Sequence, residues 1–169
     1  MIKNILISNF KKYFINTACP KSTSTMAWIN GSSVKLGCIG FARNQRYRRG
    51  NGPTPEAECK KANSKAHLIE IFNEAQQRFL MSKEVQKEVQ KAIGFNTFSG
   101  RNYWIGAEYK SGTWKWIHSK KPVKYVSRIG HNSWDSNSGQ YGWMYFNKNH
   151  AYWGKSTSSC FYPICQISY

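Results

Sequence analysis

Residues 103–117 have the sequence YWIGAEYKSGTWKWI, which contains two strand patterns separated by a turn. Aromatic and β-branched side chains dominate 103–106, and residues 114–117 alternate out and in. Such patterns favour a pleated strand, because these side chains pack well against neighbours on its surface. The intervening Lys110-Ser111-Gly112-Thr113 is typical of a tight turn. The stretch therefore predicts a β-hairpin.

Two helical patterns precede this hairpin. Thr54-Pro55-Glu56 predicts the start of the first helix, because Thr54 can cap it and Pro55 suits the first helical position. We expect it to run to about Lys65 with Cys59 on its inner face. The second pattern spans 72–93 and places the following side chains inward: Phe72, Ala75, Phe79, Val85, Val89, Ala92 and Ile93.

A polar stretch rich in Ser, Asn, Gly and Lys, residues 118–140, follows the hairpin. A loop of this length in a compact domain is usually functional. Strands are predicted near 141–147 and 161–167, with a short aromatic segment around Trp153 between them. We expect one domain over 19–169, with 1–18 as a leader or disordered extension, since Lys11 and Lys12 interrupt its short apolar stretch.

Charge limits the kinds of site that the chain can build. Lys and Arg number 25 against 8 acidic residues, for a net charge of +17, which favours acidic partners. After Ala107 the acidic residues are Glu108 and Asp135 alone, so a calcium cage or a two-metal centre there is poorly supplied. No apolar run approaches the ~18 residues that a membrane helix requires, so we expect no membrane-spanning segment.

Four arginines, Arg43, Arg46, Arg48 and Arg49, cluster around Tyr47 ahead of the predicted first helix. A nucleic-acid or heparin patch is one interpretation of this cluster. The sequence favours the other, a solvated basic loop, because no binding motif accompanies the arginines. We therefore expect no specific nucleic-acid partner.

The five cysteines are Cys19, Cys38, Cys59, Cys160 and Cys165. No CxxC pair occurs and the four histidines lack ligand spacing, which argues against a zinc site. Disulfides fit better and indicate an oxidising, extracellular compartment. Spacing alone leaves fifteen ways to pair four of the five cysteines.

Four short motifs occur in order along the chain: Ala66-His67-Leu68 after Cys59, Trp104-Ile105-Gly106, Trp114-Lys115-Trp116 and Pro163-Ile164-Cys165. In this order, the motifs resemble those of the C-type lectin-like domain over 19–169. The resemblance implies an α+β fold of two helices with small antiparallel sheets and a long functional loop. It also implies disulfides joining Cys59 to Cys165 and Cys19 to Cys38. Cys160 is then left unpaired, free or available for a disulfide-linked dimer, because the matching segment 141–145 has no cysteine.

The chain departs from the family at its calcium site. Sugar-binding members carry Glu-Pro-Asn or Gln-Pro-Asp in the long loop, whereas the one proline here lies in Lys121-Pro122-Val123. The family's Trp-Asn-Asp motif reads Trp153-Gly154-Lys155, so two oxygen ligands are missing. We therefore expect no metal and no cofactor. Our hypothesis is that the Lys155 ammonium replaces part of the ion's structural role.

The expected ligand surface is the long loop and its flanks. Trp134 and Tyr141 can stack on a ligand, amide and carboxylate groups can hydrogen-bond it, and cations can attract anionic groups. The candidate binding residues are Lys124, Arg128, Asn132, Trp134, Asp135, Asn137, Tyr141 and Lys155.

We expect a secreted recognition module that binds a glycan or glycoprotein, with anionic or sulfated glycans favoured by charge, independently of calcium. The alternative is a protein-binding or matrix assembly protein of the same fold without sugar activity. We expect no enzyme. Glu108 with Asp135, or His118 or His131 with Asp135, can be imagined as catalytic pairs, but no nucleophile motif accompanies them.

Overall fold

The computed structural model describes residues 18–43, 46–49, 54–93, 100–126, 140–147, 150–157 and 159–169. The predicted leader, apart from residue 18, and most of the long loop lie outside these residues. The helices are α1 (Pro55–Ala62), α2 (Glu74–Met81), α3 (Lys83–Ile93) and the 3-10 turn η1 (Ser32–Val34). The strands are β1 (Met26–Asn30), β2 (Cys38–Ala42), β3 (Tyr47–Arg48), β4 (His67–Leu68), β5 (Asn102–Lys110), β6 (Thr113–Trp116), β7 (Gln140–Asn147), β8 (His150–Ser156) and β9 (Cys160–Ile167).

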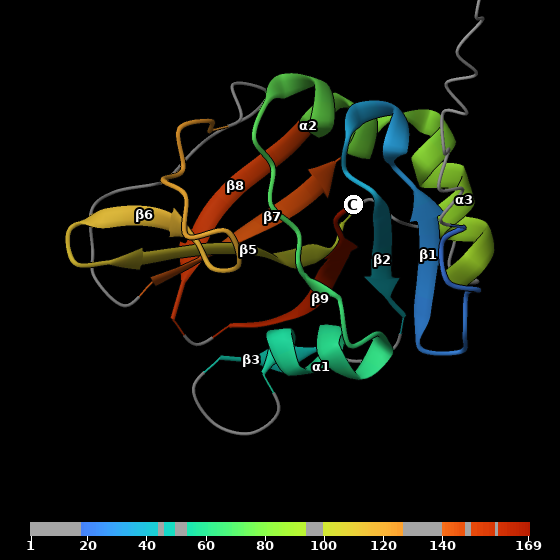
Figure 1. The fold of residues 1–169 in the computed structure, drawn as a ribbon, viewed down its shortest axis with the longest axis horizontal. Helices are drawn as coiled ribbons and strands as arrows, with labels where there is room; N and C mark the ends of the chain where they lie inside the picture. Colours follow the sequence, from blue (N-terminus) through green and yellow to red (C-terminus); the bar gives the residue numbers. More distant parts are fainter. Residues whose placement is uncertain are drawn as a thin grey trace, which may run out of the picture.

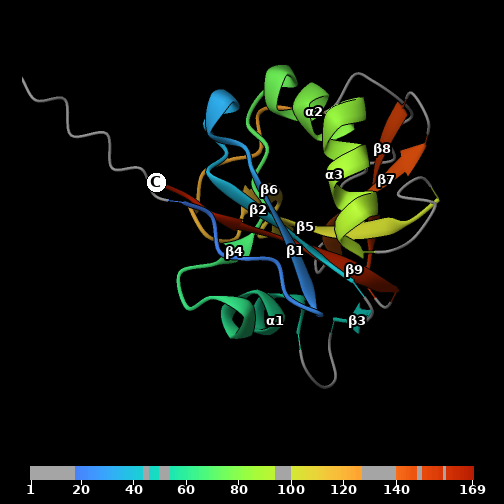
Figure 2. The same ribbon diagram turned by 90° about the vertical axis from the view of Figure 1, so that its right-hand side faces the viewer.

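Strand β9 holds the sheet together. The strand order is β1-β2-β9-β5-β7-β8, with β9 antiparallel to β2 and parallel to β5, and with β3 and β4 also paired to β9. Figures 1 and 2 show α1 on one side of β9 and α2 and α3 on the other. The fold is therefore α+β, as the family resemblance implies.

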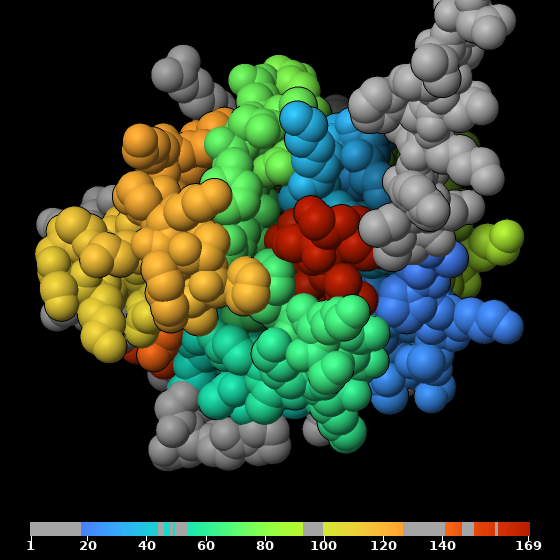
Figure 3. Space-filling model, in the orientation of Figure 1, coloured from blue at the N-terminus to red at the C-terminus, as the bar shows by residue number. Residues whose placement is uncertain are grey.

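The predicted hairpin is present as β5 and β6. Ser111 and Gly112 form its two-residue turn with φ of 51° and 80°. Positive φ at both central positions belongs to the type I′ turn, whose twist matches that of the strands. The following segment 117–126 folds back on the hairpin, since the Trp116 amide donates to the Lys121 carbonyl at 2.8 Å. The two form one lobe of the surface in Figure 3.

Helix α1 begins as predicted but ends earlier. The Thr54 hydroxyl accepts a hydrogen bond from the Ala57 amide at 3.1 Å. The helix ends at Ala62, because Asn63 has extended backbone, rather than near Lys65. Cys59 is buried on the inner face.

The second helical pattern is divided at Ser82 into α2 and α3. The prediction that Phe72 and Ala75 point inward was wrong: Phe72 is 41% exposed and precedes the helix, and Ala75 is also exposed. Gln76 and Gln77 are buried instead, because partners satisfy their amides. The Gln76 amide donates to the Val34 carbonyl at 3.1 Å. In α3, Val85 and Val89 are buried as predicted.

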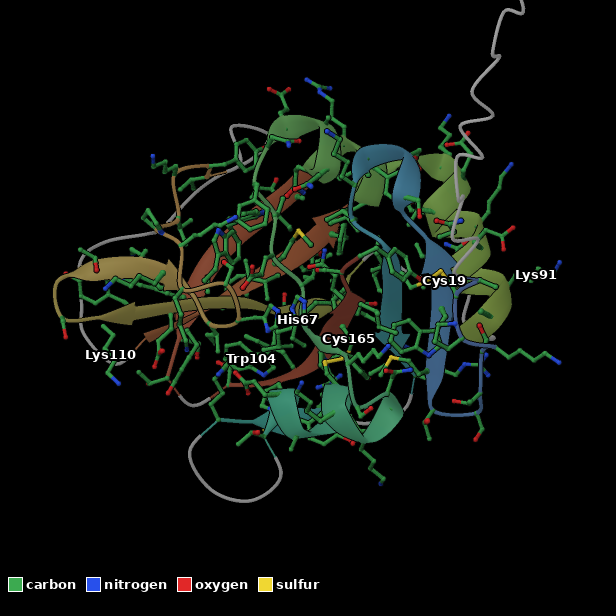
Figure 4. The ribbon with its side chains drawn as sticks, in the orientation of Figure 1. Cys19, His67, Lys91, Trp104, Lys110 and Cys165 are labelled. Carbon is green, nitrogen blue, oxygen red and sulfur yellow. A yellow bond between two sulfur atoms is a disulfide. The ribbon has the colours of Figure 1, made fainter. Side chains whose placement is uncertain are left out.

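Two apolar clusters fill the interior. The first lies between α2, α3 and the sheet and includes Leu80, Val89, Tyr103, Met144 and Trp153. The second lies beside α1, where Trp104 and Cys165 are also labelled in Figure 4. Disulfides join Cys59 to Cys165 and Cys19 to Cys38, the pairs that the family resemblance implies. Cys160 is a free, exposed thiol. Within the described part of the chain, no helix is long and apolar enough to cross a membrane.

Candidate functional site

Alternate side chains of β7 and β8 point to the two faces of the sheet. Met144, Phe146, Ala151 and Trp153 are buried in the first cluster. The residues between them carry aromatic rings that remain partly exposed on the other face. With a neighbour from β9, they form what we call the aromatic face: Tyr141, Trp143, Tyr145, Tyr152 and Phe161.

The rings of the aromatic face contact one another. The Trp143 and Phe161 centroids are 5.4 Å apart, and those of Tyr145 and Tyr152, which pair directly across the two strands, are 6.0 Å apart. These are normal distances for favourable aromatic pairs. The face therefore offers several ring surfaces that packing holds in place.

Trp143 lies opposite Gly154, and its indole ring crosses the glycine backbone. A Cβ atom built on Gly154 would come within 2.3 Å of Trp143 Cζ2 and 2.5 Å of Cε2. Only a residue without a side chain fits beneath the ring. The middle position of Trp153-Gly154-Lys155 is therefore glycine because the Trp143 ring occupies the space above it.

The residues Trp153-Gly154-Lys155 do not fit the calcium site that the lectin motif forms. The Trp153 indole N–H donates to Gln77 Oε1 at 2.8 Å, Gly154 has no side chain, and Lys155 carries a cation. None of the three supplies the side-chain oxygen that calcium prefers. Within the described residues, no group of three His, Cys, Asp or Glu side chains could hold a metal ion.

Arg49 packs against one edge of the aromatic face. Its guanidinium carbon lies 3.9 Å from the centre of the Tyr141 ring and 5.3 Å from that of Trp104. It pairs with Glu56 of α1 and is 7% exposed. Burial lowers the pKa of Arg49, and the Glu56 carboxylate opposes that shift. The expectation of a solvated basic loop is thus wrong for Arg49.

The predicted binding residues fall into two groups. Arg128, Asn132, Trp134, Asp135 and Asn137 lie outside the described residues, so their role stays a prediction.

Three candidates are described: Tyr141, Lys124 and Lys155. Tyr141 is half-buried in the aromatic face, and Lys124 is exposed after β6. Lys155 is half-buried and pairs with Gly142, so strand alternation places it on the Trp153 side of the sheet, opposite Tyr141. The structure does not bring Tyr141 and Lys155 together.

Sequence reasoning missed Trp143, Tyr145 and Tyr152. A signal was available, because 141, 143 and 145 are all aromatic at the two-residue period of a strand. The contact of Trp143 with Gly154 had no such signal, since it depends on cross-strand register.

The segment after the hairpin is anchored by Glu70 and His67. Buried Glu70 accepts hydrogen bonds through Oε1 from the amides of His118 and Ser119 at 3.0 and 2.9 Å. The His67 and His118 rings stack with centroids 3.7 Å apart. Nδ1 of His67 donates to the Leu68 carbonyl at 2.8 Å. Burial lowers the pKa of His67, that hydrogen bond opposes the shift, and His118 and Lys60 lower the pKa further.

No family model and no curated protein matches the sequence. Solved structures do match the fold. Ovocleidin-17, a major protein of the Gallus gallus eggshell calcified layer, is 16% identical with a TM-score of 0.59, covering 85% of this chain and 97% of that one. The murine dendritic cell inhibitory receptor 2 C-type lectin domain, solved in complex with N-glycan, is 16% identical with a TM-score of 0.59, covering 90% and 100%.

The C-type lectin CEL-I from Cucumaria echinata is 18% identical with a TM-score of 0.58, covering 89% of this chain and 97% of that one. The matches cover 85–90% of this chain and 97–100% of the neighbouring domains. The chain is therefore a protein of the C-type lectin-like fold.

Proposed function

We propose that the protein is a secreted recognition module that binds carbohydrate on the aromatic face, without the calcium site of the lectin motif. The observation that carries this proposal is the Trp143 ring held across Gly154. The position that would present calcium to a sugar is occupied by an aromatic surface instead. The module binds its ligand and does not turn it over.

Aromatic rings suit the apolar face of a sugar ring, because they offer a large flat area at little cost in side-chain entropy. Trp143 and Tyr145 are partly exposed on one strand, and Tyr152 lies beside them on the next. A murine neighbour of the same fold was solved with an N-glycan, which supports carbohydrate as the ligand class.

The test is glycan binding by the full chain with and without a calcium chelator. Trp143→Leu keeps apolar bulk above Gly154 but removes the ring, so we expect binding about twofold to tenfold weaker from the ~0.5–1.5 kcal/mol of an aromatic contact. Phe72→Leu is the matched control, because Phe72 is exposed and belongs to another part of the surface. Loss of binding in chelator, or equal binding by Trp143→Leu, would refute the proposal.

A second candidate is a protein-binding or matrix assembly role in which Cys160 links two chains. The exposed free thiol of Cys160 favours it. Non-reducing electrophoresis of the purified protein beside Cys160→Ser tests the link. A dimer band present in the parent and absent in the variant supports the assembly role, and a monomer in both excludes it.

A further inference from the structure

Two arginines lie over the ring of Tyr162 in β9. The guanidinium carbon of Arg101 lies 4.7 Å from the ring centre and that of Arg46 lies 5.4 Å from it. Arg101 Nη1 also donates to the backbone carbonyl of Arg43 at 3.3 Å, which fixes the position of the Arg101 side chain. We call Arg46, Arg101 and Tyr162 the arginine site.

The arginine site differs from Arg49 in its charge balance. Arg49 is buried against Glu56, so its charge is matched inside the protein. All seven glutamates lie in the described part of the chain, and there the ion pairs are Arg49 with Glu56 and Arg78 with Glu74. Within that part, Arg46 has no acidic partner. Cations gathered around one ring repel each other, and an anion between them relieves that repulsion.

The arginine site is separate from the aromatic face. Tyr162 contacts Tyr103, with ring centres 6.0 Å apart, whereas the neighbouring Phe161 contacts Trp104 and Trp143. Successive residues of β9 therefore serve opposite faces of the sheet. A ligand at one site leaves the other accessible.

We propose that the arginine site binds the sulfate ester groups of a sulfated glycan. Guanidinium groups bind tetrahedral oxyanions through paired N–H donors, and the Tyr162 ring beneath them restricts their orientation before the ligand arrives. Arg46 is exposed and its guanidinium lies over the Tyr162 ring, so it is both accessible and positioned. This inference rests on the proposed function in one respect, namely that the molecule carrying the sulfate groups is a glycan.

The experiment measures binding of a heparin-derived hexasaccharide by calorimetry over a range of salt concentrations. The variants are Arg46→Gln and the double variant Arg46→Gln/Arg101→Gln. The charge-matched control is Lys91→Gln/Lys110→Gln, whose lysines lie on α3 and at the hairpin tip, at opposite ends of the molecule in Figure 4. Thermal melts check that every variant is folded.

We expect the double variant to bind about tenfold more weakly, with the salt dependence reduced by about one counterion per arginine removed. The control should bind within about twofold of the parent protein, since its charges contribute only at long range. If the control loses as much affinity as the double variant, the binding depends on charge dispersed over the whole surface, and the proposal is overturned. Unchanged binding by the double variant would do the same.

Three further ligands test whether the bound oxyanion is a sulfate ester or a phosphate. The desulfated hexasaccharide should bind much more weakly, and equal binding would overturn the assignment to sulfate. A phosphorylated oligosaccharide or a single-stranded oligonucleotide that binds as tightly as the sulfated one would overturn the choice of ligand. Neutral glycan binding should persist in the arginine variants and weaken in Trp143→Leu, so failure at one site is distinguishable from failure at the other.

Discussion

Gly154→Asn restores the middle residue of the lectin motif and tests whether Trp143 is fixed above that position. An added Cβ would lie 2.3 Å from Cζ2, where ordinary contact begins at 3.4 Å, so the ring must retreat by about 1 Å. Trp143 is also packed against Phe161. Overpacking of this kind costs about 1–3 kcal/mol, and we expect that loss in the free energy of unfolding.

Gly154→Ala is the smaller version of the same change, because it adds only the Cβ atom. We expect a double-mutant cycle with Trp143→Ala to show a coupling energy of about 1 kcal/mol or more, since the second change removes the obstructing ring. Urea denaturation of the four proteins measures it. A loss below about 0.5 kcal/mol in Gly154→Ala, or additive effects in the cycle, would mean that the ring swings away freely and would refute the reasoning.

Two further predictions concern stability. Replacing both Cys59 and Cys165 by Ala should lower the free energy of unfolding by about 5 kcal/mol, because that disulfide spans 106 residues. Replacing both Cys19 and Cys38, which are 19 residues apart, should lower it by about 3 kcal/mol. Equal losses measured by urea denaturation would contradict the chain-entropy argument. Burial lowers the pKa of His67 in the folded protein. Below the unfolded pKa of about 6.5, the unfolded chain therefore binds one more proton than the folded protein, and the free energy of unfolding falls as pH falls. The slope is at most about 1.4 kcal/mol per pH unit. His67→Gln should flatten the stability curve between pH 5 and 7, and an unchanged curve would assign the titration to another group.

Local signals in the sequence were sufficient for the hairpin and for the start of α1. The Ser111-Gly112 turn and the Thr54 cap depend on residues a few positions apart, which a single sequence displays. The inner face of α2 was mispredicted for the opposite reason. Gln77 is buried because the Trp153 indole, 76 residues away, donates to its amide oxygen.

The candidate site was predictable only in part. Tyr141 was predicted as a binding residue and lies in the aromatic face, but the rings that accompany it become one surface only when β7 and β8 pair. The arginines of 43–49 were treated as one loop, although Arg49 is buried and Arg46 joins Arg101 from a distant segment. Register and long-range pairing decide these outcomes, and neither is visible in local composition.

Strand β9 pairs with β2, β3, β4 and β5, and it follows all of them in the chain. During synthesis, the two parts of the sheet therefore cannot join until residues 160–167 have left the ribosome. Contacts between segments so far apart in sequence make folding slow, because a large loop must close before they form. The unpaired edges of β2 and β5 are exposed meanwhile, so this stage of folding is the one in which chaperones and early oxidation of Cys165 matter most.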